Sequence, residues 1–142
     1  MIIFTGIPAS GKSSFYKELF FNSHLRISMD LLNTRNKENK LIQYGFETQS
    51  RMVIDNTNVT RESRKKYIES AKQNRYQIIG YFFESPVQAC LERNKNRKDS
   101  INEIGIKTKY KELEKPDYTE GFDKIFSVKT INNTFEISDY EI

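Results

Sequence analysis

Several residue types are scarce in this sequence of 142 residues, and each scarcity excludes a class of protein or site. The single cysteine, Cys90, and the single histidine, His24, exclude an internal disulfide and a zinc site built from these two side-chain types. No apolar run approaches the roughly 20 residues that cross a bilayer, so no membrane association is expected. The first residues resemble a buried strand and not a signal peptide, and we therefore expect a reducing, cytoplasmic setting.

What is present is typical of one globular domain spanning residues 1–142. Apolar residues make up 37% of the chain and charged residues 30%, and the 10 Phe and 8 Tyr are more than a disordered chain carries. Positive charge is concentrated in residues 1–98, which hold 17 Lys and Arg against 9 Asp and Glu. This asymmetry fits a polyanionic ligand, but it fits a merely soluble surface nearly as well.

Short apolar runs alternate with segments of helical period along the chain. The runs occupy residues 1–5, 25–28, 51–55, 76–83 and 124–129, and they are continuous rather than alternating. Continuous runs indicate strands buried on both faces, as in a parallel sheet. Helical patterns follow at residues 14–21 and 60–74 and begin near residues 85 and 100. The fold class predicted is therefore α/β, with a parallel sheet flanked by helices.

Residues 6–13, with the sequence GIPASGKS, match the G-x-x-x-x-G-K-[ST] pattern in full. A predicted strand precedes the motif and a predicted helix follows it, which is the context that separates a phosphate-binding loop from a chance match. Glycines allow the backbone N–H groups to point inward at phosphate oxygens, and the helix adds its positive end. In such loops the lysine, here Lys12, reaches the terminal phosphates, and the hydroxyl of the next residue, Ser13, ligates Mg²⁺. ATP and Mg²⁺ are thus the predicted cofactors, in a P-loop NTPase-like kinase fold.

Polar side chains follow the second and third predicted strands, at the edge of the sheet where ligands bind in open α/β folds. Asp30 could orient an acceptor hydroxyl and take its proton, although it could also merely cap the segment that follows. Asp55 could hold Mg²⁺ together with Ser13, and a turn or cap is an equal alternative. The sequence therefore predicts Asp30 as a catalytic base and Ser13 with Asp55 as the metal site.

A mobile lid is expected at about residues 94–106, after the fourth strand. Arg93 and Arg97 lie one helical turn apart, and an arginine in a lid can stabilise the transferring phosphoryl group. A solvated basic helix end is the alternative, and for Arg93 the two accounts are equal. The predicted catalytic residues are Lys12, Asp30 and Arg97. The predicted nucleotide-binding residues are Gly6, Ala9, Ser10, Gly11, Lys12, Ser13, Ser14 and Arg93.

Two weaker patterns are explained better by solvent exposure or core packing than by ligand binding. The basic side chains of residues 61–66 could contact a phosphate backbone, but a solvated helix face explains them better. Tyr44 and Phe46 could stack on a base, but packing in the core is the better explanation.

Nearly the whole chain resembles the kinase domain of the P-loop 5′-hydroxyl polynucleotide kinases. The most specific matches are the Asp-Asn-Thr-Asn segment at residues 55–58 and the late Glu-x-Pro and Glu-Gly-Phe segments, because the phosphate loop alone is common to all P-loop kinases. The matching segments are residues 6–13, 27–30, 53–58, 93–97, 114–116 and 120–122.

The resemblance implies that Lys12 and Ser13 bind ATP with Mg²⁺, that Asp30 is the general base and that Arg97 is the lid arginine. It also implies in-line transfer of the γ-phosphoryl group of ATP to the 5′-hydroxyl end of DNA or RNA. One departure bears on the acceptor: Asn33 stands where phage-type members carry an arginine that grips the acceptor phosphate, and the nearest arginine is Arg35. The D-x-D-G-T motif of the phosphatase domain in many members does not occur here.

Two other functions remain open at this stage. One is a kinase of a small hydroxylated molecule, such as a nucleoside, a sugar or an antibiotic. The other is a nucleotide-binding module without turnover, which fold alone does not exclude. The oligomeric state does not follow from the sequence.

Overall fold

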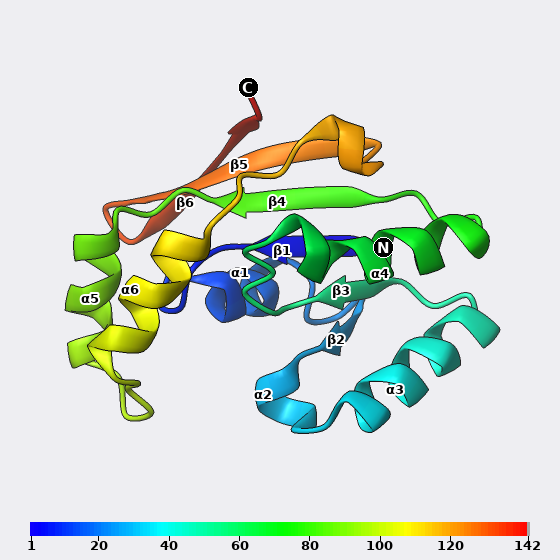
Figure 1. The fold of residues 1–142 in the computed structure, drawn as a ribbon, viewed down its shortest axis with the longest axis horizontal. Coiled ribbons are helices and arrows are strands. Elements are labelled where there is room, and N and C mark those ends of the chain that lie inside the picture. Colours follow the sequence, from blue (N-terminus) through cyan, green and yellow to red (C-terminus); the bar gives the residue numbers. More distant parts are fainter. Residues whose placement is uncertain (142) are drawn as a thin grey trace.

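The computed structural model describes residues 1–141, which form a six-stranded sheet with helices on both faces (Figure 1). The sheet order is β2-β3-β1-β4-β5-β6, and the first five strands in this order are parallel. The strands are β1 (Ile2–Thr5), β2 (Leu25–Ile27), β3 (Met52–Ile54), β4 (Ile79–Phe83), β5 (Lys124–Ile131) and β6 (Thr134–Asp139). The central position of β1 places the segment that follows it in the middle of the carboxyl edge.

The structure confirms the predicted parallel sheet flanked by helices and adds one strand that the sequence analysis did not identify: β6 runs antiparallel to β5 and forms a hairpin with it. The hairpin turns at Asn132 and Asn133, both with positive φ (51° and 62°), a conformation that asparagine tolerates better than most residues. Its side chains reach the phosphate loop: Phe135 packs edge-on against Phe15 with ring centroids 5.1 Å apart, and a Cβ at Gly11 would lie 3.2 Å from the Phe135 ring. The β5–β6 hairpin thus packs against the phosphate loop and supports it.

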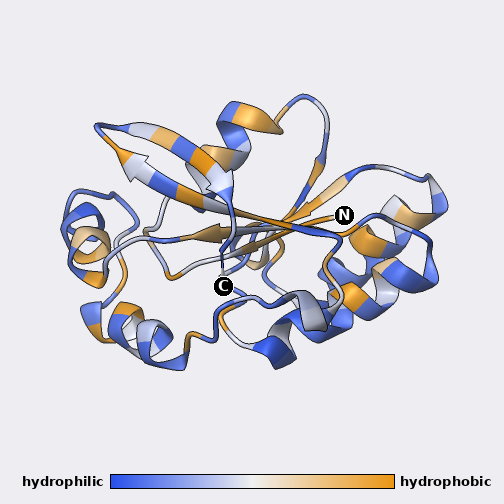
Figure 2. Ribbon diagram, turned by 90° about the horizontal axis from the view of Figure 1, so that it is seen from above, coloured by the Kyte–Doolittle hydropathy of each residue, from blue (hydrophilic) through white to orange (hydrophobic). Residues whose placement is uncertain are grey.

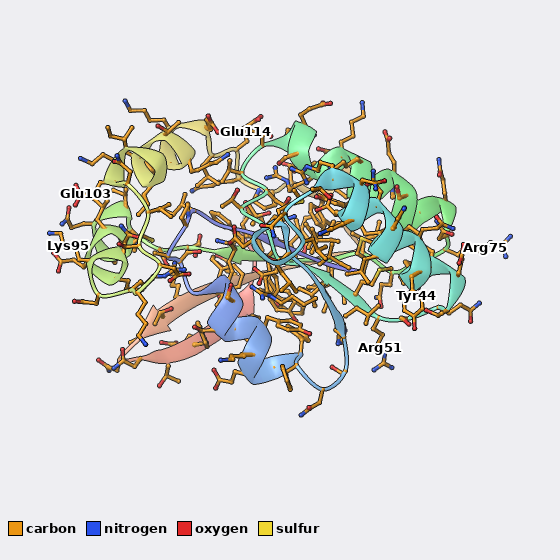
Figure 3. The ribbon with its side chains drawn as sticks, turned by 90° about the horizontal axis from the view of Figure 1, so that it is seen from below. Tyr44, Arg51, Arg75, Lys95, Glu103 and Glu114 are labelled. Atoms are coloured by element: carbon orange, nitrogen blue, oxygen red, sulfur yellow. The ribbon has the colours of Figure 1, made fainter. Side chains whose placement is uncertain are left out.

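The helices divide between the two faces of the sheet (Figures 2 and 3). Alternation in β1 decides the division: Ile3 packs in one cluster with residues of α3 and α4, while Ile2 and Phe4 pack in another with Phe15 of α1. The helices are α1 (Lys12–Leu19), α2 (Met29–Leu32), α3 (Arg35–Glu47), α4 (Arg61–Gln73), α5 (Val87–Lys95) and α6 (Glu103–Glu112), with a 3₁₀ turn, η1, at Tyr118–Glu120. In the described chain no helix is long and apolar enough to span a membrane.

A solvated helix face for residues 61–66 and core packing for Tyr44 and Phe46 are each confirmed only in part. Arg64 on α4 is fully buried and not part of a solvated face: its guanidinium makes two hydrogen bonds to Glu120, at 2.8 and 3.0 Å, and a third to the Asn58 carbonyl at 2.8 Å. Phe46 packs against the core as expected, but Tyr44 is 53% exposed. Tyr44 lies at the end of the molecule remote from Lys95 and Glu103 (Figure 3).

Candidate active site

A cleft of about 540 Å³ opens at the carboxyl edge of the sheet, between the phosphate loop, α2 and the end of α5 with the loop that follows it. It gathers side chains that are up to about 90 residues apart in the sequence, as expected where parallel strands end together. The predicted site residues that line it are Ala9, Gly11, Lys12, Ser13, Ser14, Asp30, Asp55, Arg93 and Arg97. The two others, Gly6 and Ser10, lie in the loop behind this surface; Ser10 is buried.

The loop between β1 and α1 is tightly wound. A Cβ on Gly6 would lie 2.7 Å from Ser10 Oγ and 2.9 Å from Phe83 Cβ, so only glycine fits there without movement. The Gly6 N–H donates to the Thr57 carbonyl at 2.9 Å, which joins the loop to the segment after β3. Ala9 and Gly11 have positive φ, 64° and 98°, and α1 begins directly afterwards. Consecutive N–H groups near a helix start favour an anion here.

The Lys12 side chain folds back over this loop. Its Nζ donates to the Ile7 carbonyl at 3.0 Å, and no ion pair of Lys12 occurs among residues 1–141. Burial lowers the pKa of Lys12 to about 8, although the Asp55 and Asp30 carboxylates partly oppose the shift. A buried ammonium group without a carboxylate partner is stabilised by an anion, and the terminal phosphates of a nucleotide supply one.

Ser13 and Asp55 provide two oxygen atoms side by side, from the start of α1 and the end of β3. The Ser13 hydroxyl donates to Asp55 Oδ2 at 3.2 Å, and the Asp55 carboxylate is almost completely buried. Hydroxyl and carboxylate oxygens are the ligands that Mg²⁺ prefers. Within the described residues no cluster of three or more His, Cys, Asp or Glu could hold a metal, so the pair fits Mg²⁺ bound mainly through nucleotide phosphates and water.

Arg26 joins this pair, a contact that sequence reasoning missed. Its Nε donates to Asp55 Oδ2 at 2.8 Å and its Nη2 donates to Ser13 Oγ at 3.0 Å. The signal available was alternation in β2: Leu25 and Ile27 face the α3–α4 core, which turns Arg26 to the α1 side.

Asp30 lines the cleft from the short helix α2. It is exposed, and no hydrogen bond or ion pair engages its carboxylate within residues 1–141. The turn is fixed by its neighbour, because the Met29 N–H donates to Asn56 Oδ1 at 2.9 Å. A held backbone with an unengaged carboxylate leaves this side chain able to accept a proton from a bound hydroxyl.

A buried carboxylate, Glu38, contacts two residues that line the cleft, Arg35 and Asn56, and was not expected from the sequence. It accepts hydrogen bonds from Arg35 at 3.0 Å, from Tyr67 at 3.0 Å and from Asn56 at 3.2 Å. Burial opposes ionisation of Glu38, but the Arg35 and Tyr67 hydrogen bonds outweigh it and lower its pKa. Burial and the adjacent Glu38 charge raise the pKa of Tyr67 to about 12. The network ties Asn56, and through it the Asp30 turn, to α3 and α4.

The segment expected as a lid consists of the end of α5, a loop and the start of α6. Arg97 lies just beyond α5, lines the cleft and pairs with Asp99 at 3.3 Å. Arg93 donates to the Ala9 carbonyl at 2.9 Å and so holds the phosphate loop itself. Asn94, which sequence reasoning passed over, brackets Ile101 with two hydrogen bonds of 2.7 and 3.0 Å. These bonds fix how the loop carrying Arg97 faces the cleft.

Comparison with known proteins places this geometry in a family context. A family model described as AAA domain (AAA_33) matches residues 1–115. The chain is 31% identical over 137 residues to the "Putative bifunctional polynucleotide phosphatase/kinase" of Acanthamoeba polyphaga mimivirus, covering 90% of this chain and 32% of that relative. It is 27% identical to the bifunctional polynucleotide phosphatase/kinase of Schizosaccharomyces pombe, covering 90% and 33%. The chain thus spans about a third of the length of these two relatives.

Other relatives have different names. The L-seryl-tRNA(Sec) kinase of Methanococcus maripaludis is 24% identical over 135 residues, covering 82% of this chain and 53% of that protein. Among solved structures, Kti12 of Chaetomium thermophilum in complex with ADP-AlF3 gives a TM-score of 0.65 at 18% identity, covering 90% and 88%. A gluconokinase from Sinorhizobium meliloti 1021 gives 0.63 at 19% identity, covering 90% and 81%. At these identities the solved structures establish the fold alone.

Proposed function

Because the chain belongs to the AAA domain family AAA_33 and has the fold of P-loop kinases, we propose that it transfers the γ-phosphoryl group of ATP to the 5′-hydroxyl end of DNA or RNA. The observation that carries the proposal is that one cleft holds the phosphate loop with Lys12, the Ser13–Asp55 oxygens and the unengaged carboxylate of Asp30. Two relatives are named as polynucleotide phosphatase/kinases, which supports this acceptor class.

In the proposed reaction each residue has one task. The loop N–H groups and Lys12 hold the terminal phosphates, and Ser13 with Asp55 holds the metal ion. Mg²⁺, when bound, neutralises charge on the phosphates and keeps them in line. Asp30 accepts the proton of the 5′-hydroxyl. The hydroxyl oxygen then bonds to the γ-phosphorus as the bond between this phosphorus and the ADP oxygen breaks. Arg97 stabilises the equatorial charge that develops during transfer.

Arg35 supports a polynucleotide acceptor despite the departure at Asn33. Asn33 ends α2 with a φ of 69°, a left-handed position that an arginine would adopt less easily. Arg35 lies two residues further on, lines the same cleft and is held by Glu38, while 60% of its side chain stays exposed. A cation held by Glu38 in the same cleft as Asp30 suits the phosphate that follows the 5′-terminal nucleoside, a group that a free nucleoside or sugar lacks.

The test is incubation with γ-labelled ATP and a panel of acceptors: 5′-hydroxyl oligonucleotides, nucleoside 3′-monophosphates, nucleosides and sugars. We expect label on the first two classes, and the Arg35→Ala variant should raise KM for them about tenfold with little change in the KM for ATP, as loss of a charge-assisted contact predicts. Lys37→Ala, an exposed neighbouring cation outside the cleft, is the matched control. Equal or preferred labelling of nucleosides or sugars would refute the acceptor class.

A hydroxyl other than a polynucleotide end is the second candidate, favoured by the seryl-tRNA kinase relative. The same panel, extended with seryl-tRNA, decides between the two. A nucleotide-binding module without turnover is the weaker alternative, because such a module has no use for the Asp30 carboxylate beside the phosphate loop.

A further inference from the structure

The two oxygens assigned to the metal already have a cation. The Arg26 guanidinium bridges them, with Nε 2.8 Å from Asp55 Oδ2 and Nη2 3.0 Å from Ser13 Oγ, and Ser13 Oγ itself lies 3.2 Å from the same Oδ2. Asp55 is 2% exposed and Arg26 28%. A carboxylate so deeply buried needs a counter-charge when no metal is present, and Arg26 provides it.

Mg²⁺ and the Arg26 guanidinium cannot both contact Asp55 Oδ2 and Ser13 Oγ without strong electrostatic repulsion. Magnesium binds oxygen at about 2.1 Å, so a metal on Asp55 Oδ2 would lie within roughly 5 Å of the Arg26 Nε that bonds the same atom. Two cations at that separation in a poorly solvated site repel each other strongly. The guanidinium does not lose its proton, so the repulsion is relieved only by movement of Arg26.

An alternative position is available to the Arg26 side chain. Its guanidinium carbon already lies 5.9 Å from the centre of the Tyr16 ring of α1, and 28% of the Arg26 side chain is exposed to solvent. Rotation away from Asp55 would exchange the ion pair for a closer position over that ring or for water.

We propose that Arg26 is a built-in competitor of the metal: it neutralises Asp55 in the metal-free protein and must be displaced when Mg²⁺ enters with the nucleotide. The inference rests on the metal site of the proposed function. It implies that the protein binds divalent metal less tightly than Ser13 and Asp55 alone would allow. It also implies that a nucleotide that arrives without metal finds the charge of Asp55 already neutralised by Arg26.

The test measures metal binding directly, by Mn²⁺ electron paramagnetic resonance in the presence of excess ADP, with no acceptor. Replacing Arg26 by Gln removes the positive charge and retains polarity, and we expect the Mn²⁺ dissociation constant to fall about tenfold, the order of effect of one nearby like charge. Arg51→Gln removes the same charge from an exposed position just before β3 and should change nothing. Unchanged or weaker Mn²⁺ binding in a folded Arg26→Gln protein would overturn the inference.

A second variant covers the case in which Arg26→Gln does not fold. Arg26→Lys keeps a counter-charge but cannot reach both oxygens at once, so it should tighten Mn²⁺ binding by a smaller factor. An unchanged constant in that variant, or no Mn²⁺ binding in any of the proteins, would also overturn the inference. Neither result depends on which acceptor is phosphorylated, and the label-transfer panel judges that question separately.

Discussion

At the scale of single residues, three charged side chains in or next to the cleft are buried: Lys12, Asp55 and Glu38. Lys12 bonds to a carbonyl of its own loop instead of a carboxylate, while Asp55 and Glu38 are buried with cations attached. Burying each of these charges costs free energy unless a partner of opposite charge is present. Among residues 1–141 Lys12 has no carboxylate partner, and an anion over the phosphate loop would supply the opposite charge.

The lowered pKa of Lys12 predicts how nucleotide binding depends on pH. Because its free-state pKa is about 8 and a bound phosphate raises it, binding above pH 8 must take up a proton. The dissociation constant for ADP should be constant near pH 7 and should rise by up to about tenfold per pH unit above 8. Titration calorimetry in buffers of different ionisation enthalpy measures both the constant and the proton uptake. A constant affinity from pH 7 to 9.5 would show that Lys12 stays charged.

Asp30→Asn tests the proposed base with almost no change of shape. The amide cannot accept the hydroxyl proton, so the transfer rate should fall about 10²- to 10⁴-fold while ADP affinity changes less than about twofold. Single-turnover labelling gives the rate, and Glu62→Gln, an exposed carboxylate in the first turn of α4, serves as control. Near-normal transfer by Asp30→Asn would remove it from the mechanism.

At the scale of elements, short side-chain bonds fix the segments that bear the reacting groups. The amide of Asn94, at the end of α5, closes the loop to α6 by pairing with both backbone groups of Ile101. Behind it, Ile106 of α6 is buried against Ile7 of the phosphate loop. The base of the α5–α6 pair is thus anchored while its tip, with Arg97, faces the cleft.

Asn94→Ala should therefore loosen this tip without unfolding the domain. The Ile101 N–H and carbonyl lose their partners, at a cost of about 1–3 kcal/mol to the loop conformation. We expect faster hydrogen exchange across residues 96–102 and a fall in kcat that approaches that of Arg97→Ala, with ATP affinity largely kept. Asn96→Ala, two residues along and exposed, is the matched control. If both variants behaved alike, the bracket around Ile101 would have no role in turnover.

The elements that could be predicted are those with strong local patterns. The central strands were predictable because their apolar runs are continuous, and the meeting of Ser13, Asp30 and Asp55 followed from the common edge of parallel strands. The hairpin strand β6 was missed because only two of its six residues, Phe135 and Ile137, are apolar.

The roles of Arg26 and Glu38 could not be predicted, because all the partners described above except Arg35 lie 13 to 29 residues away in the sequence and meet them only in the folded chain. Alternation in β2 indicates on which face of the sheet Arg26 lies, but nothing local identifies Asp55 as its partner or marks Glu38 of a polar helix as buried. In α3, the apolar stripe is too narrow to reveal that Glu38 faces inward.

At the scale of the whole molecule, one buried ion pair joins the middle of the chain to its C-terminal part. Arg64 of α4 is completely buried, and its partner Glu120 belongs to η1, immediately before β5. A third bond to the Asn58 carbonyl connects the pair to the segment that follows Asp55. Stability and site geometry therefore depend on the same arginine.

Arg64→Ala should lower the free energy of unfolding by about 3–5 kcal/mol, because Glu120 would remain buried without a counter-charge. Replacing both residues together, as Arg64→Met with Glu120→Leu, should recover a substantial part of that loss. Urea unfolding measures the difference, and Arg61→Ala, which removes an exposed side chain that donates to Thr119 at 3.1 Å, should cost no more than about 0.5 kcal/mol. A small effect of Arg64→Ala would mean that water replaces the missing cation.

The placement of Phe135 against Gly11 has a consequence for synthesis of the protein. A ribosome releases the phosphate loop early, yet the aromatic ring that backs its last glycine emerges more than 120 residues later. A nascent chain halted after residue 115, where the family match stops, would lack β5, β6 and Glu120, and it should not retain nucleotide on a column. Nucleotide capture would then mark the moment at which the last hairpin closes.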